Sequence, residues 1–422
     1  MKTSQTISNF LVNNYYNFLN FLLITSTLSS TFHYKISKKL MLATFIIALF
    51  KYINFTNIKT LLAEPLFKVT LLYLVYISIT LFWTPDFHEG RGNVQNYLYY
   101  FTLPIIIFSL IPNKKYINII TNIYIVAIVT TSLISYAIYF KILKFSYFRF
   151  GLWPNVKMYS VFIPSNLYSV LVALGILLLL YNFIHSNYIK KILYLFPISS
   201  LLYILVLSGG RTGQVTLIAI LVIISIVYSK TSIKKSLLIL LTLLLISYTA
   251  YSTNKNFRNR STKIYTETIS TLNTKDYTTS VGVRLFSYVI ANEYIKNYNF
   301  LIGEGAGSAL ITKNTIIKKY LSKEKEGAYR FPHFHQNYIR VFIQYGLIGL
   351  VLFLLIFYYI YKIKIKDSKI NYVKNIILLT MLISNIFEEL LFVRDTMLIF
   401  AIFIGIIIAQ KIEEDKEKTK AI

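Results

Sequence analysis

Long apolar blocks alternate with short polar connectors along nearly the whole chain. About twelve blocks come close to the roughly 20 residues that an α-helix needs to cross the hydrocarbon core of a bilayer. Membrane β-barrels have alternating segments of roughly ten residues instead, and that pattern is missing from the sequence. We therefore predict an all-α polytopic membrane protein with spans at 15–31, 40–53, 67–84, 95–111, 117–140, 160–184, 192–208, 211–228, 235–250, 337–360, 372–392 and 395–410.

One long polar segment, residues 252–336, interrupts the series of spans. It divides the chain into predicted transmembrane helices 1–9 (1–251), a large loop, and predicted helices 10–12 with a polar tail (337–422). Up to residue 335 the loop holds thirteen Lys and Arg against six Asp and Glu, and residues 283–298 have a helical pattern. Because loops of this length are uncommon without a function, we expect the loop to have one.

Composition narrows the class of protein further. Hydrophobic residues make up 55% of the chain and the mean hydropathy is +0.57, which excludes a soluble globular protein. No cysteine is present, so disulfide and thiol chemistry are excluded as well. The net charge of +27 sits mostly between the spans. We therefore expect membrane lipids and phosphate as anionic partners, and no nucleic acid.

The orientation of the spans follows from the basic connectors. Lys and Arg in four connectors and in the C-terminal tail fall on one side of the predicted membrane, which the positive-inside rule assigns to the cytoplasm. Both termini are then cytoplasmic, and the loop faces outward. The basic segments 35–39 and 141–149 fall on the other side. Either the first hairpin is drawn wrongly or those charges contact the outer headgroups.

The segment SGGRTG, residues 208–213, joins two predicted spans and contains the first candidate site. A helix that begins near Thr212 presents unpaired N–H groups and a positive dipole end. Glycines such as Gly210 let a ligand approach the backbone, and Arg211 adds a guanidinium that suits phosphate. The segment lacks the Gly-Lys-Ser/Thr ending of a P-loop. A tight turn with an arginine that reaches the headgroups is the alternative.

A second arginine, Arg284, lies near the start of the helical pattern in the loop. A guanidinium close to a helix start can bind an anion together with the backbone N–H groups. The alternative is an ordinary surface charge, which the sequence around Arg284 does not exclude.

Two of the five histidines, His333 and His335, lie two residues apart just before the predicted span 337–360, which Asn337 is expected to cap. The positive end of a helix dipole disfavours a charged imidazole, so such a histidine stays neutral and can accept a proton. The alternatives are a metal pair and a histidine at the membrane interface. Glu324 and Glu326 are only loosely placed as further metal ligands.

Charged side chains also occur at the last predicted outer turn, in the segment NIFEELLFVRDTM. Carboxylates at or within a span are costly unless they are paired. We predict that Glu388 or Glu389 forms an ion pair with Arg394, which orders the ends of the last two helices. That pair is either structural or part of the active site.

Together these features resemble the O-antigen ligase family, whose relatives include O-antigen polymerases and protein O-oligosaccharyltransferases. The resemblance rests on the Arg-Thr-Gly turn, the large loop that ends in His-x-x-Tyr (His335 to Tyr338) before a GLIGL helix, and the Glu and Arg of the last hairpin. The family histidine is commonly followed by Asn, whereas Gln336 and then Asn337 follow it here.

The resemblance implies a GT-C-like glycosyltransferase of the bacterial inner membrane whose active site faces the periplasm and uses no metal or other cofactor. It implies transfer of a polysaccharide from undecaprenyl diphosphate to lipid A–core. Two family arginines that contact the diphosphate correspond to Arg211 and Arg284, with Gly210 and Thr212 beside them, and the catalytic histidine corresponds to His335. The expected supporting residues are His333, Asn337, Tyr338, Glu388 and Arg394.

Two other functions remain open. An O-antigen polymerase uses the same donor, but polymerases often have two sizeable outer loops, and the loop before Tyr159 is short here. A transporter or flippase usually has charged residues and broken helices near the middle of the membrane. The predicted spans of this chain are nearly free of internal charge, which favours an enzyme.

Overall fold

The computed structural model describes residues 2–50, 53–144, 160–230, 232–253, 255–275, 277–320 and 333–420. Every regular element in these ranges is helical, which confirms the predicted all-α class. Helices suit a chain in lipid because they satisfy all backbone hydrogen bonds within one segment. Several residues and segments used above lie outside the described residues, namely 145–149, Tyr159, Glu324, Glu326 and the rest of 321–332.

Seven helical segments in the described part of the chain are long and apolar enough to cross a membrane. They are Pro65–Phe82 (α4, Pro65–Ile79, and η1, Thr80–Phe82), α7 (Lys114–Tyr139), α8 (Ser165–Ile184), α9 (Tyr188–Ser208), Ser236–Thr253 of α11 (Ile233–Thr253), α16 (Asn337–Lys362) and Arg394–Thr419 of α18 (Arg394–Lys420). The structure therefore supports a polytopic membrane protein.

The other five predicted spans also fall on helices, but these are shorter, interrupted or more polar. They are α1 (Lys2–Ser30), α2 (Tyr34–Leu49), the run α5 (Phe87–Tyr97), η2 (Leu98–Thr102) and α6 (Leu103–Leu110), α10 (Arg211–Ser229) and α17 (Ser368–Ser384). A short helix, α3 (Phe55–Ala63), precedes α4. Of the roughly twelve spans predicted from the sequence, seven thus meet both the length and the hydropathy needed to cross a membrane within the described residues.

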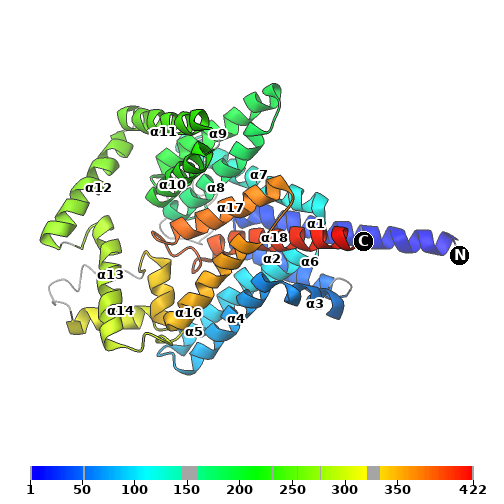
Figure 1. The fold of residues 1–422 in the computed structure, drawn as a ribbon, viewed down its shortest axis with the longest axis horizontal. Helices are drawn as coiled ribbons and strands as arrows, with labels where there is room; N and C mark the ends of the chain where they lie inside the picture. The colour runs from blue at the N-terminus through cyan, green and yellow to red at the C-terminus, as the bar shows by residue number, and fades with distance from the viewer. Residues whose placement is uncertain are drawn as a thin grey trace.

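The centre of the bundle is α18, in which 94% of the apolar window is buried. It packs against α6, where a Cβ on Gly405 would lie 2.6 Å from Phe108 Cβ. By contrast, only 6% of the α11 window is buried. Helix α11 lies at the edge of the bundle (Figure 1). Because its leucines are exposed, its outer face suits contact with lipid.

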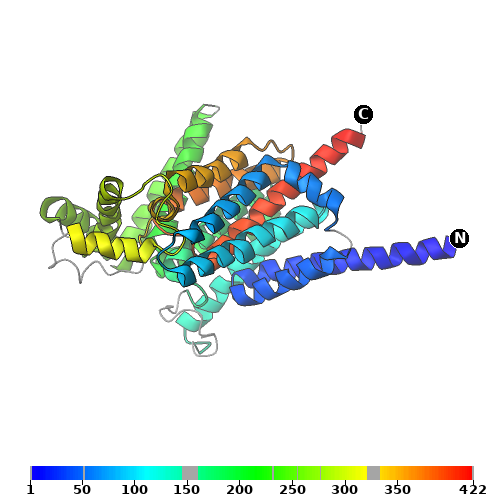
Figure 2. The ribbon, with the colours of Figure 1, turned by 90° about the horizontal axis from the view of Figure 1, so that it is seen from below.

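Three helices of the large loop gather at the end of the molecule opposite the two chain termini (Figures 1 and 2). They are α12 (Lys255–Thr274), α13 (Ser280–Asn297) and α14 (Ala309–Tyr320). A second hydrophobic core joins this part to α16, through Phe286 and Tyr294 of α13, Ile316 of α14 and Ile343 of α16. Helices α13 and α14 of the loop are therefore packed against the helix that follows His335.

Helix α16 is broken at Gly346, and the chain around the start of the glycine-rich segment GEGAGS (303–308) packs against this break. Gly346 has φ 64° and ψ −167°, so the helical hydrogen bonds are interrupted there. Residues 300–305 run beside the break, and four backbone hydrogen bonds join the two segments: Glu304 N to Ile343 O, Gly305 N to Gln344 O, Leu347 N to Phe300 O, and Ile348 N to Leu301 O. Trp83 Nε1 also donates to Gly303 O at 3.0 Å. The glycine-rich segment thus fastens the loop to α16.

The end of α17 differs from the prediction. We predicted a span at 372–392, but α17 ends at Ser384 and a nonhelical turn, residues 385–393, leads to α18. This turn carries Glu388 and Glu389, whose carboxylates find polar partners outside the span. The prediction was wrong because the apolar residues around these carboxylates continue the hydrophobic pattern without a break.

Candidate active site

The SGGRTG segment forms a tight turn between α9 and α10. Gly209 adopts the left-handed conformation (φ 61°) that ends α9, and Arg211 is the first residue of α10. A Cβ on Gly210 would lie 2.3 Å from Ser169 Oγ of α8, and one on Gly213 would lie 2.1 Å from Ser169 O. The glycines therefore let α10 approach α8. The expectation that they also leave room for a ligand stays a prediction.

The side chain of Arg211 faces a carboxylate from the loop. Its Nη1 lies 3.5 Å from Oε2 of Glu267 on α12, and both side chains are largely buried. The same Oε2 accepts the N–H of Val281, in the first turn of α13, at 3.3 Å. An anion thus lies between a guanidinium and a helix start, as expected for an anion site. The sequence interpretation missed Glu267, although it is the only acidic residue in α12.

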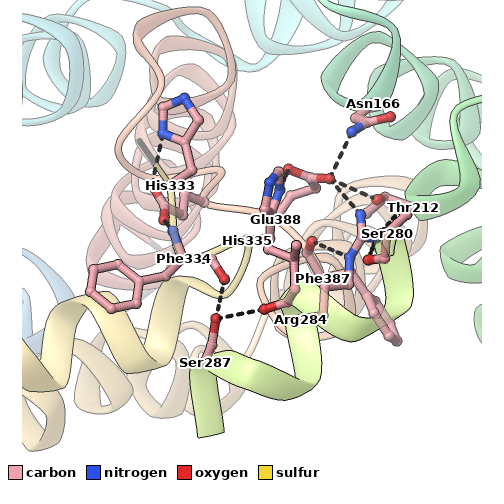
Figure 3. A network of polar contacts seen from close by, with 12 residues as sticks. Asn166, Thr212, Ser280, Arg284, Ser287, His333, Phe334, His335, Phe387 and Glu388 are labelled. Carbon is pink, nitrogen blue, oxygen red and sulfur yellow. Dashed lines mark hydrogen bonds and ion pairs between the residues drawn. The ribbon is translucent and has the colours of Figure 1, made fainter. Parts of the chain in front are cut away.

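Arg284 joins α13 to the turn between α17 and α18 (Figure 3). Its Nη2 donates to Oε1 of Glu388 at 3.0 Å and its Nε donates to Phe387 O at 3.3 Å. Its Nη1 donates to the backbone and side-chain oxygens of Ser280, at 2.9 and 3.0 Å. These contacts make Arg284 more than the isolated surface charge that the sequence left open.

Four helices begin around the carboxylate of Glu388. Besides Arg284 of α13, Oε1 accepts Asn166 Nδ2 of α8 at 2.9 Å and Thr212 Oγ1 of α10 at 3.4 Å. Its Oε2 lies 3.6 Å from Nδ1 of His335, just before α16 (Figure 3). Because each helix start has a positive dipole end, this is a place that stabilises negative charge. Asn166 gave no signal in the sequence.

His335 has an unusual backbone conformation and a partly exposed ring. Its φ is 53°, in the left-handed region, and its side chain is 26% exposed. Among the described residues, Nδ1 has no hydrogen-bond partner, since 3.6 Å to Glu388 exceeds hydrogen-bond length. That distance nevertheless allows an ion pair if the ring gains a proton.

The cap of α16 differs from the prediction. Gln336, not Asn337, is the N-cap, and its side chain accepts Ile339 N at 2.6 Å. Gln336 is the last residue with an extended backbone, whereas Asn337 already lies in the helix. The N–H of Asn337 donates instead to Asn385 O at 2.9 Å. Asn337 therefore joins α16 to the end of α17, and Tyr338 does the same through Leu382 O at 2.9 Å.

Glu389 binds the segment before His335 and a buried arginine. Its Oε1 accepts the N–H of Phe334 at 2.5 Å, and its Oε2 accepts Arg340 Nη1 at 2.6 Å. His333 Nδ1 lies 3.7 Å from Oε2. Burial alone would raise the pKa of Glu389, but Arg340 and His333 outweigh it and lower the pKa to about 2. Glu389 is therefore charged at neutral pH.

Arg394 does not pair with Glu388 or Glu389, so that prediction was wrong. It begins α18, and its side chain donates to Asn96 Oδ1 at 3.1 Å and to Tyr34 Oη at 3.0 Å. The guanidinium groups nearest the two glutamates come from Arg284 and Arg340 instead. The turn after α17 directs Glu388 and Glu389 toward the loop, whereas Arg394 faces α2 and α5.

The structure thus brings Thr212, Arg284, His335 and Glu388 into one cluster, with Arg211 bound to Glu267 beside it. Within the described ranges, no group of three or more His, Cys, Asp or Glu side chains is arranged to hold a metal ion. That the reaction uses no metal stays a prediction. The binding roles of Gly210 and Thr212 also remain predictions.

Residues 196–354 match a family model described as O-antigen ligase. The match runs from within α9 to within α16 and includes Arg211, Arg284 and His335. No curated protein matches the chain. The family implies a glycosyltransferase-like enzyme of the ligase and polymerase type that acts on a lipid-linked polysaccharide. With its all-helical architecture and several apolar helices, the chain is a polytopic membrane protein, and its residues 196–354 are similar to the O-antigen ligase family.

Proposed function

We propose that this enzyme transfers O-antigen polysaccharide from undecaprenyl diphosphate to a sugar hydroxyl of lipid A–core, without a metal and with inversion. The observation that carries the proposal is the convergence of the starts of α8, α10, α13 and α16 on Glu388, with His335 and Arg284 in contact distance. A site that stabilises negative charge beside a proton acceptor matches the two needs of this reaction.

The donor half of the site consists of the two arginines. As the bond between the anomeric carbon and the phosphate oxygen breaks, its electron pair leaves with the diphosphate. Arg211 and Arg284 and the first N–H groups of α10 and α13 lie where they can stabilise that charge. Thr212 and Gly210 belong to the same helix start. The carrier is already activated, so no nucleotide is required.

The acceptor half of the site consists of His335 and Glu388. The acceptor hydroxyl oxygen forms the new bond to the anomeric carbon and loses its proton to the imidazole. Nδ1 of His335 faces Glu388, so Nε2 is the nitrogen left to take that proton. The nearby carboxylate stabilises the imidazolium that forms. A single displacement of this kind inverts the anomeric centre.

The arrangement in the membrane supports a periplasmic site. The two termini lie at the end of the molecule opposite α12, α13 and α14 (Figure 2), and the basic connectors predict that the termini are cytoplasmic. The loop and the cluster around Glu388 then belong to the periplasmic side of the inner membrane. Both substrates carry lipids, and the exposed face of α11 suits their lateral entry.

The Arg211–Glu267 pair predicts a variant with tighter donor binding. Glu267 holds the position where we place a donor phosphate, so Glu267→Gln removes a competing anion. The two side chains keep 21% and 17% of their surface exposed, so water weakens the pair. We therefore expect the KM for the carrier-linked donor to fall about threefold to tenfold, with little change in kcat. Steady-state transfer kinetics measure this.

Glu293→Gln is the matched control, because among the described residues the carboxylate of Glu293 pairs with Lys296 of the same helix, away from Arg211. Its donor KM is expected to stay at the wild-type value. An increase in donor KM on Glu267→Gln would mean that Glu267 supports the site instead of competing for it.

A deletion strain tests the proposed activity. Loss of a ligase leaves full-length polymer on the carrier and bare core on lipid A, and this is the result we expect. Loss of a polymerase would leave a core that bears one repeat unit. Lipid profiles of the strain distinguish the two.

Purified protein in detergent provides the second test. With carrier-linked glycan, acceptor lipid, excess EDTA and no nucleotide, we expect transfer to continue. Transfer without membrane compartments excludes a pure transporter. Strict dependence on an added divalent ion contradicts the metal-free mechanism.

A further inference from the structure

His335 adopts a backbone conformation that its own side chain disfavours. A φ of 53° is in the left-handed region, where the Cβ of an ordinary residue is crowded by the following carbonyl. Such a conformation persists only where the surrounding contacts impose it, and it is frequent at active sites. The contacts that fix the residues before and after His335 therefore determine where its imidazole points.

Phe334 is held from both sides. Its N–H donates to Oε1 of Glu389 at 2.5 Å, and its carbonyl accepts Ser287 Oγ of α13 at 2.5 Å (Figure 3). Phe334 is 3% exposed and belongs to the core shared by α13, α14 and α16. On the other side, Gln336 is fixed as the cap of α16. The two residues that flank His335 are therefore held in place, Phe334 by its N–H, carbonyl and ring and Gln336 by its side chain.

Glu389 is itself held rigidly. Arg340, one turn into α16, binds its Oε2 at 2.6 Å, and the side chains of the pair are only 12% and 5% exposed. The guanidinium stacks on the ring of Phe392 at 4.0 Å. A buried pair between a charged donor and a charged acceptor keeps its geometry better than an exposed one. The ion pair thus connects the turn after α17 to the start of α16.

We infer that Glu389 is a positioning residue, which, held by Arg340, fixes the Phe334 peptide and thereby aims the imidazole of His335. The two neighbouring glutamates then have different roles at His335. Glu388 faces its ring, and Glu389 fixes the backbone before it. Glu389 contacts no substrate in this scheme. The inference rests on the proposed role of His335 in the reaction.

Glu389→Gln tests the kinetic consequence. The amide keeps the size of the side chain but loses the charge that binds Arg340, so the Phe334 peptide is held less firmly. We expect kcat to fall about tenfold to a hundredfold, with the KM of donor and acceptor within about twofold of wild type. A rise in either KM with unchanged kcat would show substrate contact and overturn the inference.

Glu89→Gln is the matched control. Glu89 is the outer partner of Arg340, at 4.0 Å from Nη2, and its side chain is 36% exposed. Its hydrogen bond and ion pair go to Asp86 and Arg340, outside residues 333–336. The change removes a negative charge near the same guanidinium without loosening Phe334, so kcat is expected to stay within about twofold of wild type.

Thermal unfolding of four variants tests the backbone conformation independently of activity. Glycine tolerates φ 53°, so His335→Gly is expected to melt about 2 °C above His335→Ala when Glu389 is present. In the Glu389→Gln background that difference is expected to vanish, because the conformation is no longer imposed. An equal difference in both backgrounds overturns the inference. Full activity of His335→Ala would instead refute the proposed function and leave this thermal test valid.

Discussion

His335→Ala is expected to abolish polysaccharide transfer while the protein still inserts and purifies in normal yield. Without the imidazole the remaining proton acceptor of the cluster is the carboxylate of Glu388. It is a weaker base than imidazole, and its Oε1 is already bound by Arg284, Asn166 and Thr212. Loss of a general base typically costs a factor of about 10² to 10⁴ in rate. The measurement is transfer by the purified variant, together with surface polysaccharide in a strain that carries it.

His88→Ala is a suitable control for that experiment. His88 is exposed on α5 and precedes Glu89, so it belongs to the same end of the molecule without joining the cluster around Glu388. We expect wild-type transfer from this variant. Normal surface polysaccharide in the His335→Ala strain would remove His335 from the mechanism.

Gly346→Ala is expected to prevent stable folding, with a loss of at least about 3 kcal/mol in the free energy of unfolding. The φ and ψ of Gly346 lie in a region that is essentially limited to glycine. A Cβ there would lie 2.3 Å from Leu301 O and 2.5 Å from Gly303 N. Both are backbone atoms of the hydrogen-bonded segment, so neither can move aside without breaking the link between the loop and α16.

The control is Gly92→Ala in α5. A Cβ on Gly92 would meet nothing within 4 Å, and alanine is favoured over glycine within a helix. We expect this variant to match or slightly exceed the wild-type melting temperature. The readouts are the yield of monodisperse protein in detergent and its thermal unfolding. A Gly346→Ala protein with the wild-type melting temperature would show that the break in α16 is not needed.

The break at Gly346 also bears on the active site. The segment of α16 before the break begins just after His335 and carries Arg340. Backbone hydrogen bonds join residues 300–305 to the end of this segment at the break. A change that releases this link frees the helix that holds the Glu389 pair. Gly346→Ala is therefore expected to lose both stability and catalysis, whereas His335→Ala is expected to lose catalysis and still fold.

The sequence by itself determined the helical spans and the positions of the key residues along them. Lipid offers no hydrogen bonds to a backbone, so each apolar block had to pair its own N–H and C=O groups. It does so by forming a helix, as in α7, α8 and α16. Glycines at 209 and 210 end one helix and start the next, so the sequence also placed Arg211 at a helix start. His335 was likewise expected before a helix from its local pattern alone.

Only the tertiary structure decided which charges meet. Glu388 lies close to Arg394 in the sequence, yet it pairs with Arg284, 104 residues away. The packing of α13 against the turn after α17 makes that choice, and no local pattern encodes it. The same holds for Glu267 with Arg211, and for the glycines that fit α10 to α8. Helices form from contacts a few residues apart, whereas an ion pair between distant segments depends on how the finished helices pack.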